Sequence, residues 1–215
     1  MSPSRRFPPP RALLLLATKA PAVLRAGAAV VLVLLLRILG GSALAADWHD
    51  KLAGCLACHG QDGVSSMPEV PSLAGQPDLF TQWQLVYFRD AVRANEVMVP
   101  LAQDLSDAEI RALGAHFASL PAADPPAGSD PEPELTATGA KLVAAGRCAS
   151  CHLPSFAGQG EMPRLAGQRE DVLAKALRDY KSGARRGRGN AAMPEITYGL
   201  GEAEIRAIAH FLSRR

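Results

Sequence analysis

The chain is 215 residues long, only 5% of its residues are aromatic, and its formal net charge is +2, from 23 basic and 21 acidic residues. Six of the basic residues lie within residues 1–45, which contain no acidic residue. Without that segment the balance becomes 17 basic against 21 acidic residues, a net charge of −4, which argues against nucleic acid as a partner.

Residues 1–46 have the organisation of a secretory signal peptide. The basic residues accompany an apolar run from Ala26 to Leu36, and small residues from Ser42 to Ala46 follow. The run is shorter than the about 20 apolar residues that a membrane span needs. We therefore expect cleavage after Ala45 or Ala46, with an uncleaved anchor as the alternative. The expected location is periplasmic, either soluble or loosely associated with the membrane.

Helical patterns dominate the chain after the signal. Residues 47–58 and 138–148 are predicted to be short helices that lead into the cysteines, and residues 76–93 and 168–182 to be a second helix in each half. In the first half, the segment Ser106–Glu109 is a capping box that opens a last helix. No alternating strand pattern appears, so the expected fold class is all-α.

Every cysteine lies in one of two copies of the pattern Cys-x-x-Cys-His, which is the covalent attachment signature of c-type haem. Two thiols at this spacing reach the two vinyl groups of one porphyrin, and the histidine then reaches the iron. Four cysteines could instead bind zinc or act as redox dithiols, but neither chemistry needs a histidine after each second cysteine. The sequence therefore predicts two covalently attached haem c groups with their iron. The residues concerned are Cys55, Cys58 and His59 in the first copy and Cys148, Cys151 and His152 in the second.

The chain after the signal repeats itself. Residues Pro71–Gln76 return as Pro163–Gln168, and Ala108–Ala112 as Ala203–Ala207, at a spacing of 92 to 95 residues. Between the copies, a proline-rich segment favours extended backbone and marks a linker. Each copy would be a domain of roughly 75 to 80 residues, which buries little core of its own without a porphyrin. The expected boundaries are residues 1–46 for the signal peptide, 47–120 for the first domain, 121–135 for the linker and 136–215 for the second domain.

An iron with one histidine ligand either takes a second ligand or leaves a position open to substrate. Met98 and Met193 lie in equivalent places about 40 residues after the two histidines, which lets the chain wrap to the other haem face. Met67 and Met162 follow the histidines closely and are out of register with each other. Because methionine opposite histidine saturates the iron and raises its reduction potential, Met98 and Met193 are the expected ligands, with core packing as the alternative.

Two prolines and two arginines also recur in the repeat. Pro71 and Pro163 follow the histidines, and a proline carbonyl can accept a hydrogen bond from the second ring nitrogen of a ligating histidine. A plain turn is the alternative. Arg93 and Arg185 recur before the two methionines and are candidates to pair with haem propionates, with a solvated arginine as the alternative.

Together these motifs resemble the dihaem cytochromes c of the c4 type. The resemblance rests on the paired Cys-x-x-Cys-His motifs, the two Pro-x-Leu-Ala-Gly-Gln segments, Met98 and Met193, and the Leu-Ser-Asp-Ala-Glu-Ile helix start. It covers the chain from about Asp47 to the C-terminus, and it implies two tandem class I cytochrome c domains, each wrapped around one covalently bound haem.

The same resemblance has implications for the haem pocket. It implies that the carbonyls of Pro71 and Pro163 bind the axial histidines, and that Leu73 and Leu165 pack on the haems. It also implies a periplasmic location and a role in passing electrons to terminal oxidases or other acceptors.

The expected function is electron transfer without catalysis, because two saturated irons offer no substrate position. The protein would shuttle single electrons between respiratory donors and a terminal oxidase or other acceptor. One alternative is the cytochrome subunit of a periplasmic dehydrogenase complex, and a weaker one is a dihaem peroxidase, which requires an iron that opens. The expected partners are redox proteins, with neither nucleic acid nor a small-molecule substrate.

Overall fold

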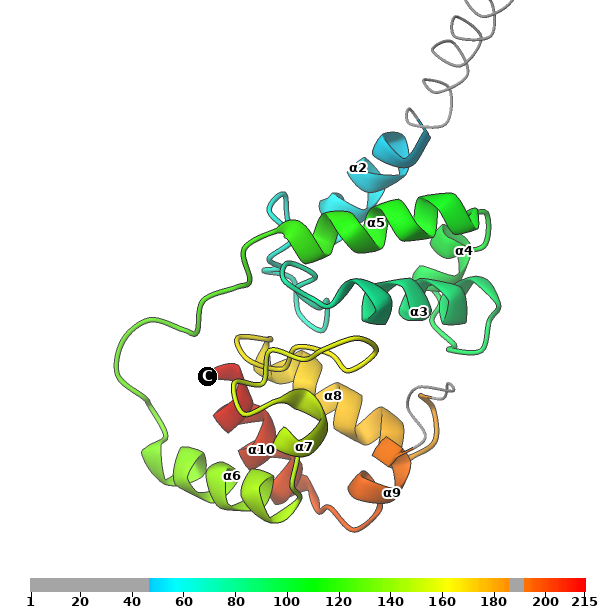
Figure 1. Cartoon of the computed structure of the whole chain (residues 1–215). Coiled ribbons are helices and arrows are strands. Elements are labelled where there is room, and N and C mark those ends of the chain that lie inside the picture. Colours follow the sequence, from blue (N-terminus) through cyan, green and yellow to red (C-terminus); the bar gives the residue numbers. More distant parts are fainter. Residues whose placement is uncertain (1–46, 186–191) are drawn as a thin grey trace, which may run out of the picture. The chain divides into compact units, whose positions relative to one another are not determined.

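The structure, a computed structural model, describes residues 47–185 and 192–215 (Figure 1). The predicted signal peptide, residues 1–46, lies outside the described residues. The described residues form helices joined by loops, with no strand among them, which confirms the all-α prediction. None of the helices in these two ranges combines the length and the hydrophobicity that a membrane crossing requires.

The first group of helices packs α3 onto α5, while α2 contacts α5 and α4 contacts α3. Leu85 and Phe88 of α3 face Leu113 and Phe117 of α5 in one apolar core, where Leu113 and Phe117 are almost fully excluded from solvent. Because these side chains recur at helical spacing, each helix turns one apolar face to the core. The helices of this group are α2 (Asp47–His59), α3 (Asp78–Arg89), α4 (Met98–Ala102) and α5 (Asp107–Ser119).

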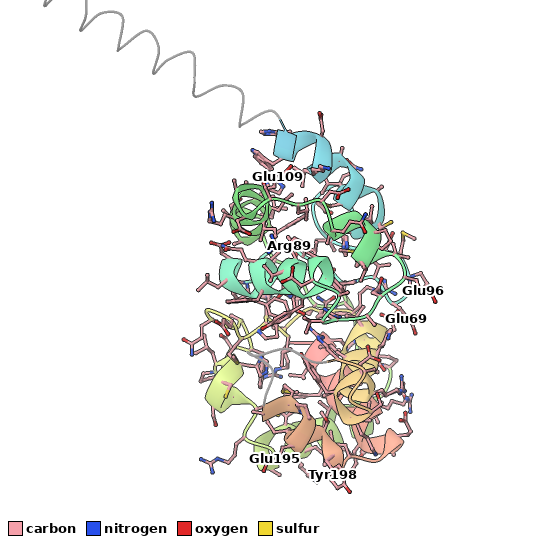
Figure 2. The ribbon with its side chains drawn as sticks, turned by 90° about the vertical axis from the view of Figure 1, so that its right-hand side faces the viewer. Glu69, Arg89, Glu96, Glu109, Glu195 and Tyr198 are labelled. Atoms are coloured by element: carbon pink, nitrogen blue, oxygen red, sulfur yellow. The ribbon has the colours of Figure 1, made fainter. Side chains whose placement is uncertain are left out.

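The start of α5 is fixed by the predicted capping box and by an arginine of α3 (Figure 2). Ser106 Oγ accepts a hydrogen bond from the Glu109 amide at 3.3 Å, and Glu109 Oε2 accepts one from the Ser106 amide at 2.7 Å. Arg89 Nη1 donates to the Leu105 carbonyl at 3.2 Å and to Asp107 Oδ1 at 2.8 Å. The end of α3 is therefore tied to the beginning of α5.

The second group is built around α10, which packs against both α6 and α8, while α9 packs on α8. Its core includes Val143 of α6, Leu173 of α8, and Ile205 and Phe211 of α10. The ring of Phe156 meets that of Phe211 edge to face, with centroids 6.1 Å apart. The helices of this group are α6 (Pro133–Ala145), α7 (Ala149–His152), α8 (Glu170–Lys181), α9 (Ala192–Tyr198) and α10 (Glu202–Ser213).

The crossing of α6 and α10 depends on a glycine. A Cβ atom at Gly139 would lie 2.6 Å from the Cβ atom of Phe211 and would overlap the Ala207 carbonyl oxygen. Only a residue without a side chain allows the two helix backbones to approach this closely.

Gly139→Ala is expected to lower the free energy of unfolding by about 1–3 kcal/mol, because the two helices must move apart to admit the methyl group. Alanine is otherwise the better helix former by about 1 kcal/mol, so the clash and the propensity have opposite signs. Chemical denaturation would measure the change, with Lys141→Ala on the exposed face of α6 as the control. A variant at least as stable as the wild type would contradict the tight crossing.

The helix predicted over residues 138–148 is wrong at both ends. Helix α6 begins earlier, at Pro133, because proline is tolerated in the first turn of a helix. It stops at Ala145, and Arg147 then adopts a left-handed conformation with φ of 54°. The second cysteine motif therefore lies mainly on the separate short helix α7, whereas the first motif completes the continuous helix α2.

The second predicted helix of each half is confirmed in place but is shorter than expected. Helix α3 ends at Arg89 because Ala91 is left-handed, with φ of 53°, and the chain turns there. Helix α8 ends at Lys181, just before Gly183, which has φ of 74°.

His210, on α10, lies buried between two carboxylates. Its Nδ1 is 2.8 Å from Glu170 Oε2, and its Nε2 is 3.1 Å from Asp130 Oδ1. Burial of the ring opposes its protonation, but the hydrogen bonds to Glu170 and Asp130 outweigh burial and raise the pKa of His210. The protonated ring thus connects α10 to the start of α8 and to the segment before α6.

This connection should weaken at alkaline pH. Because the folded pKa of His210 lies above its unfolded value of about 6.5, its stabilisation is complete below that value and is lost as the pH rises through the raised pKa. His210→Gln is therefore expected to flatten the decline of the unfolding free energy above about pH 6.5. Denaturant titrations at a series of pH values would measure this, and identical slopes for the variant and the wild type would contradict it.

Candidate haem-binding sites

The first candidate site is presented by the last turn of α2. Cys55, Cys58 and His59 lie at helical spacing of three and four, so all three side chains share one face of the helix. Both cysteines are free thiols and half-buried. Burial raises the pKa of the Cys55 thiol, although its sulfur also contacts the Lys51 carbonyl at 3.4 Å. The pair is thus available for two thioether bonds to one porphyrin.

The imidazole of His59 is oriented by the carbonyl predicted to hold it. His59 Nδ1 donates to the Pro71 carbonyl oxygen at 2.8 Å, and the residue is only 6% exposed. Burial lowers the pKa of His59, and the Pro71 bond only partly opposes this, so the neutral ring is favoured. With the proton on Nδ1, the lone pair of Nε2 is free to bind a metal.

The second candidate site repeats this geometry. His152 Nδ1 donates to the Pro163 carbonyl oxygen at 2.9 Å, and burial again lowers the pKa of the ring. Cys148 and Cys151 are free thiols, and Cys151 is exposed. Among the described residues, neither histidine has a hydrogen-bond partner on Nε2. The recurrence of one arrangement at two places indicates one role for both histidines.

The predicted pocket leucines lie against the two apolar cores. Cys55, Leu73 and Met98 all pack against the core of the first helix group, so three predicted site residues meet there. Cys148 and Leu165 pack in the same way against the core of the second group. Each motif therefore opens onto apolar side chains, as a porphyrin requires.

Both predicted methionine ligands are half-buried at the start of short helices that the sequence analysis did not anticipate. Met98 is the first residue of α4, and Asn95 Oδ1 accepts hydrogen bonds from the amides of Val97 and Met98, at 3.0 and 2.7 Å. Met193 lies in the first turn of α9, where its carbonyl accepts a hydrogen bond from the buried Thr197 hydroxyl at 2.8 Å. Hydrogen bonds from neighbouring side chains thus fix the backbone at both methionines.

The two rejected methionines lie in loops after the histidines. Met67 is 43% exposed. The Met162 amide donates to the Gln159 carbonyl at 2.8 Å within a short loop bridge. Met98 and Met193, chosen from their register in the repeat, remain the predicted ligands.

Arg93 and Arg185 converge on a single acceptor, Gln84 of α3. Gln84 Oε1 is 2.8 Å from Arg93 Nη1 and 3.0 Å from Arg185 Nη2. Each guanidinium also lies over a ring, that of Arg93 over Phe88 at 4.6 Å and that of Arg185 over Tyr180 at 4.8 Å. Neither arginine extends freely into solvent, and the shared partner Gln84 was not predicted because it has no counterpart in the other half.

Two positively charged guanidinium groups therefore share one uncharged acceptor, Gln84 Oε1. Burial, together with the neighbouring Arg185, lowers the pKa of Arg93 to about 9. Arg185 is only 8% exposed, and its buried Nε has no hydrogen-bond partner among the residues that the structure describes. A buried donor without an acceptor is costly, so this cluster fits an additional anion such as a haem propionate.

The residues present fit covalently bound haem. Four thiols are free of disulfides, two neutral imidazoles offer Nε2, and among the described residues the buried Nε of Arg185 has no acceptor. Small helical domains with this motif, a proline carbonyl on the histidine and a methionine before the last helix are class I cytochromes c. The chain contains two of them in tandem.

Comparison with known proteins narrows this class. The sequence model of the cytochrome c family matches residues 136–214. Cytochrome c4 of Thiocapsa roseopersicina is 36% identical over 74% of this chain and 85% of its own length. The thiosulfate dehydrogenase electron acceptor of Thiomonas intermedia is 32% identical over 76% of this chain and 79% of its own length. The crystal structure of reduced cytochrome c4 from Pseudomonas stutzeri superposes with a TM-score of 0.71 at 28% identity, covering 78% of this chain and 96% of that one.

The chain belongs to the cytochrome c4 family. It is therefore an electron-transfer protein that carries covalently bound haem c, and it is a carrier of electrons and not an enzyme. Its partners are accordingly redox partners.

Proposed function

We propose that the protein is a periplasmic dihaem carrier that passes single electrons from respiratory donors to a terminal oxidase or another acceptor. After export and removal of residues 1–46, the two haem domains are residues 47–120 and 136–215, with residues 121–135 as the linker. Each domain attaches one haem through its cysteine pair and binds the iron between a histidine and a methionine. The assigned residues are Cys55, Cys58, His59 and Met98 in the first domain and Cys148, Cys151, His152 and Met193 in the second.

The observation that carries this assignment is the pair of hydrogen bonds from the histidines to proline carbonyls. His59 and His152 are buried, bonded through Nδ1 at 2.8 and 2.9 Å, and turned so that Nε2 stays free. A packing histidine normally uses both nitrogens, as His210 does here. A carbonyl that accepts a hydrogen bond from Nδ1 is instead typical of a metal-bound imidazole.

The chain's residues would restrict the bound haem to electron transfer. When bound, the haem supplies an iron that cycles between two oxidation states. The Pro71 and Pro163 carbonyls hold the imidazoles in one tautomer, while Met98 and Met193 would each supply a second ligand to an iron. With both ligands bound, substrates would be excluded and only outer-sphere electron exchange would remain.

The charge of the mature chain and the two clustered arginines bear on the haem propionates and on the kind of partner. Arg93 and Arg185 would neutralise propionates that otherwise add negative charge to a chain of net −4. The leading partners are thus redox proteins whose surfaces complement a mildly acidic carrier.

A second candidate is the electron-accepting subunit of a periplasmic dehydrogenase. It is favoured by the relative from Thiomonas intermedia, whose name is thiosulfate dehydrogenase electron acceptor. A solved thiosulfate dehydrogenase from Marichromatium purpuratum also contains a region similar to 74% of this chain, at 29% identity and a TM-score of 0.64.

Anaerobic stopped-flow spectroscopy tests both candidates with the purified, haem-loaded protein. We expect both haems to be reduced by respiratory membranes supplied with quinol, and to be reoxidised by oxidase-containing membranes when oxygen is admitted. Reduction only by a thiosulfate dehydrogenase with thiosulfate would favour the second candidate. Reduction by neither donor would contradict the proposed role.

A further inference from the structure

Two glutamines at equivalent positions of the repeat reach across to the opposite domain. Gln168 hydrogen-bonds both backbone groups of Ser72, with Ser72 N donating to its Oε1 at 3.0 Å and its Nε2 donating to Ser72 O at 2.9 Å. Gln76 bonds both backbone groups of Arg164 in the same way, at 3.0 Å each. Gln76 and Gln168 are only 4% and 7% exposed. These four bonds form a reciprocal clamp between the two domains.

Each glutamine of this clamp bonds the peptide group that orients a histidine of the opposite domain. The Ser72 amide and the Pro71 carbonyl belong to one peptide unit, so a single planar group accepts from His59 Nδ1 and donates to Gln168 Oε1. The peptide between Pro163 and Arg164 likewise accepts from His152 and donates to Gln76. A hydrogen-bonded chain therefore runs from each histidine through one peptide into the other domain.

The physical effect of such a chain is cooperative. When the N–H of a peptide donates to an acceptor, its carbonyl oxygen becomes more negative and accepts more strongly. A stronger bond to Nδ1 makes the imidazole a more basic ligand, and hydrogen bonds of this kind to a ligating histidine tune the metal. A more basic imidazole favours the oxidised iron, which lowers the reduction potential.

We propose that Gln168 and Gln76 are positioning residues that act across the domain interface. Each strengthens the hydrogen bond that holds the axial histidine of the opposite domain, and each thereby lowers the reduction potential of the haem bound there. The inference rests on the proposed histidine ligands. It deepens the proposed function, because the domain interface then acts directly on the two irons. Gln168 governs the haem of the first domain, and Gln76 governs the haem of the second.

The test uses Gln168→Leu and Gln76→Leu in the full, haem-loaded protein. Haem methyl resonances resolved by NMR give the midpoint of each haem separately. Gln168→Leu should raise the potential of the haem bound at His59, with a roughly threefold change in its reduction equilibrium, about 28 mV for a one-electron couple. The haem at His152 should be unaffected. Gln76→Leu should give the reverse pattern.

A second measurement separates positioning from mere loosening of the interface. In the reduced protein, the Nδ1 proton resonance of His59 should move upfield in Gln168→Leu, while that of His152 stays in place. Asp171→Ala is the control, because it removes the inter-domain hydrogen bond to the Glu69 amide, at 2.9 Å, and leaves the Pro71–Ser72 peptide intact. It should not reproduce the selective shift. Gln168→Met keeps the length of the side chain and serves if the leucine variant does not fold.

The outcomes separate this inference from the proposed function. Equal shifts at both haems, a shift only at the haem of the mutated domain, or no shift would overturn the crossed roles. A wild-type protein whose spectra lack histidine ligation at two haems would instead overturn the proposed ligands. That result is visible before any variant is made.

Discussion

Replacing Met98 or Met193 by alanine is expected to remove the axial sulfur from one haem only. Each variant should lose about half of the weak near-infrared sulfur-to-iron band, and the potential of that haem should fall by about 0.1 V or more, within the ~0.8 V range that axial ligands set. The vacated position should also bind carbon monoxide in the reduced state. These changes follow because alanine has no atom that reaches the iron.

Met67→Ala and Met162→Ala are matched controls for this prediction. Both residues lie in loops close after the histidines, and Met67 is largely exposed. Their loss should leave the band, the potentials and the carbon monoxide reactivity unchanged. An intact band in Met98→Ala or Met193→Ala, or its loss in either control, would show that the assigned ligand is wrong.

The double substitution Cys148→Ser and Cys151→Ser is expected to unfold most of the second domain. A domain of roughly 75 to 80 residues gains only about 3–5 kcal/mol from its own core, so the covalently held porphyrin supplies a large share of the apolar contacts. Apolar residues expected to pack on the haem, such as Leu165 beside the core of this domain, would lose that cover and become exposed to water. The intact mass should drop by one haem, and far-UV circular dichroism should lose close to half of its helical signal.

Ser150→Ala is the control for the cysteine variants, because Ser150 is exposed and lies between the two cysteines. It should retain both haems and full helicity. The corresponding change of Cys55 and Cys58 to serine should remove the other haem and unfold the other half. Retention of native helicity after loss of a haem would show that the domains do not depend on the porphyrin.

The chemical groups of the sites could be predicted because they are short-range patterns. The spacing of Cys55, Cys58 and His59 fits one helical face, and a proline after the histidine offers only a carbonyl. The repeat then selects Met98 and Met193 by register without any knowledge of the fold. The structure contains the histidine–carbonyl bond of both copies at 2.8 and 2.9 Å.

The local breaks in the helices were less predictable, since they depend on single backbone conformations. Arg147 turns left-handed after Gly146, and this separates α6 from α7 although the sequence reads as one helical run. The short helices α4 and α9 begin at or beside the methionines, and their five and seven residues give too little periodicity to read.

The contacts between the domains could not be predicted from the repeat. Gln76 and Gln168 recur, but only the structure reveals that each bonds the backbone of the other copy. Gln84 has no equivalent in the second half, and its role arises from the approach of Arg93 and Arg185. Of these contacts, those that cross between the domains join residues 88 to 101 positions apart, beyond the reach of any local pattern.

Under the proposed ligation, both irons are held between a histidine and a methionine and serve only to transfer electrons. An optical redox titration of the full, haem-loaded protein, performed with and without carbon monoxide, distinguishes this arrangement from an open iron. We expect two one-electron waves of equal amplitude whose midpoints and reduced spectra do not change with carbon monoxide. A single wave, or a carbon monoxide complex forming rapidly at either haem, would contradict it.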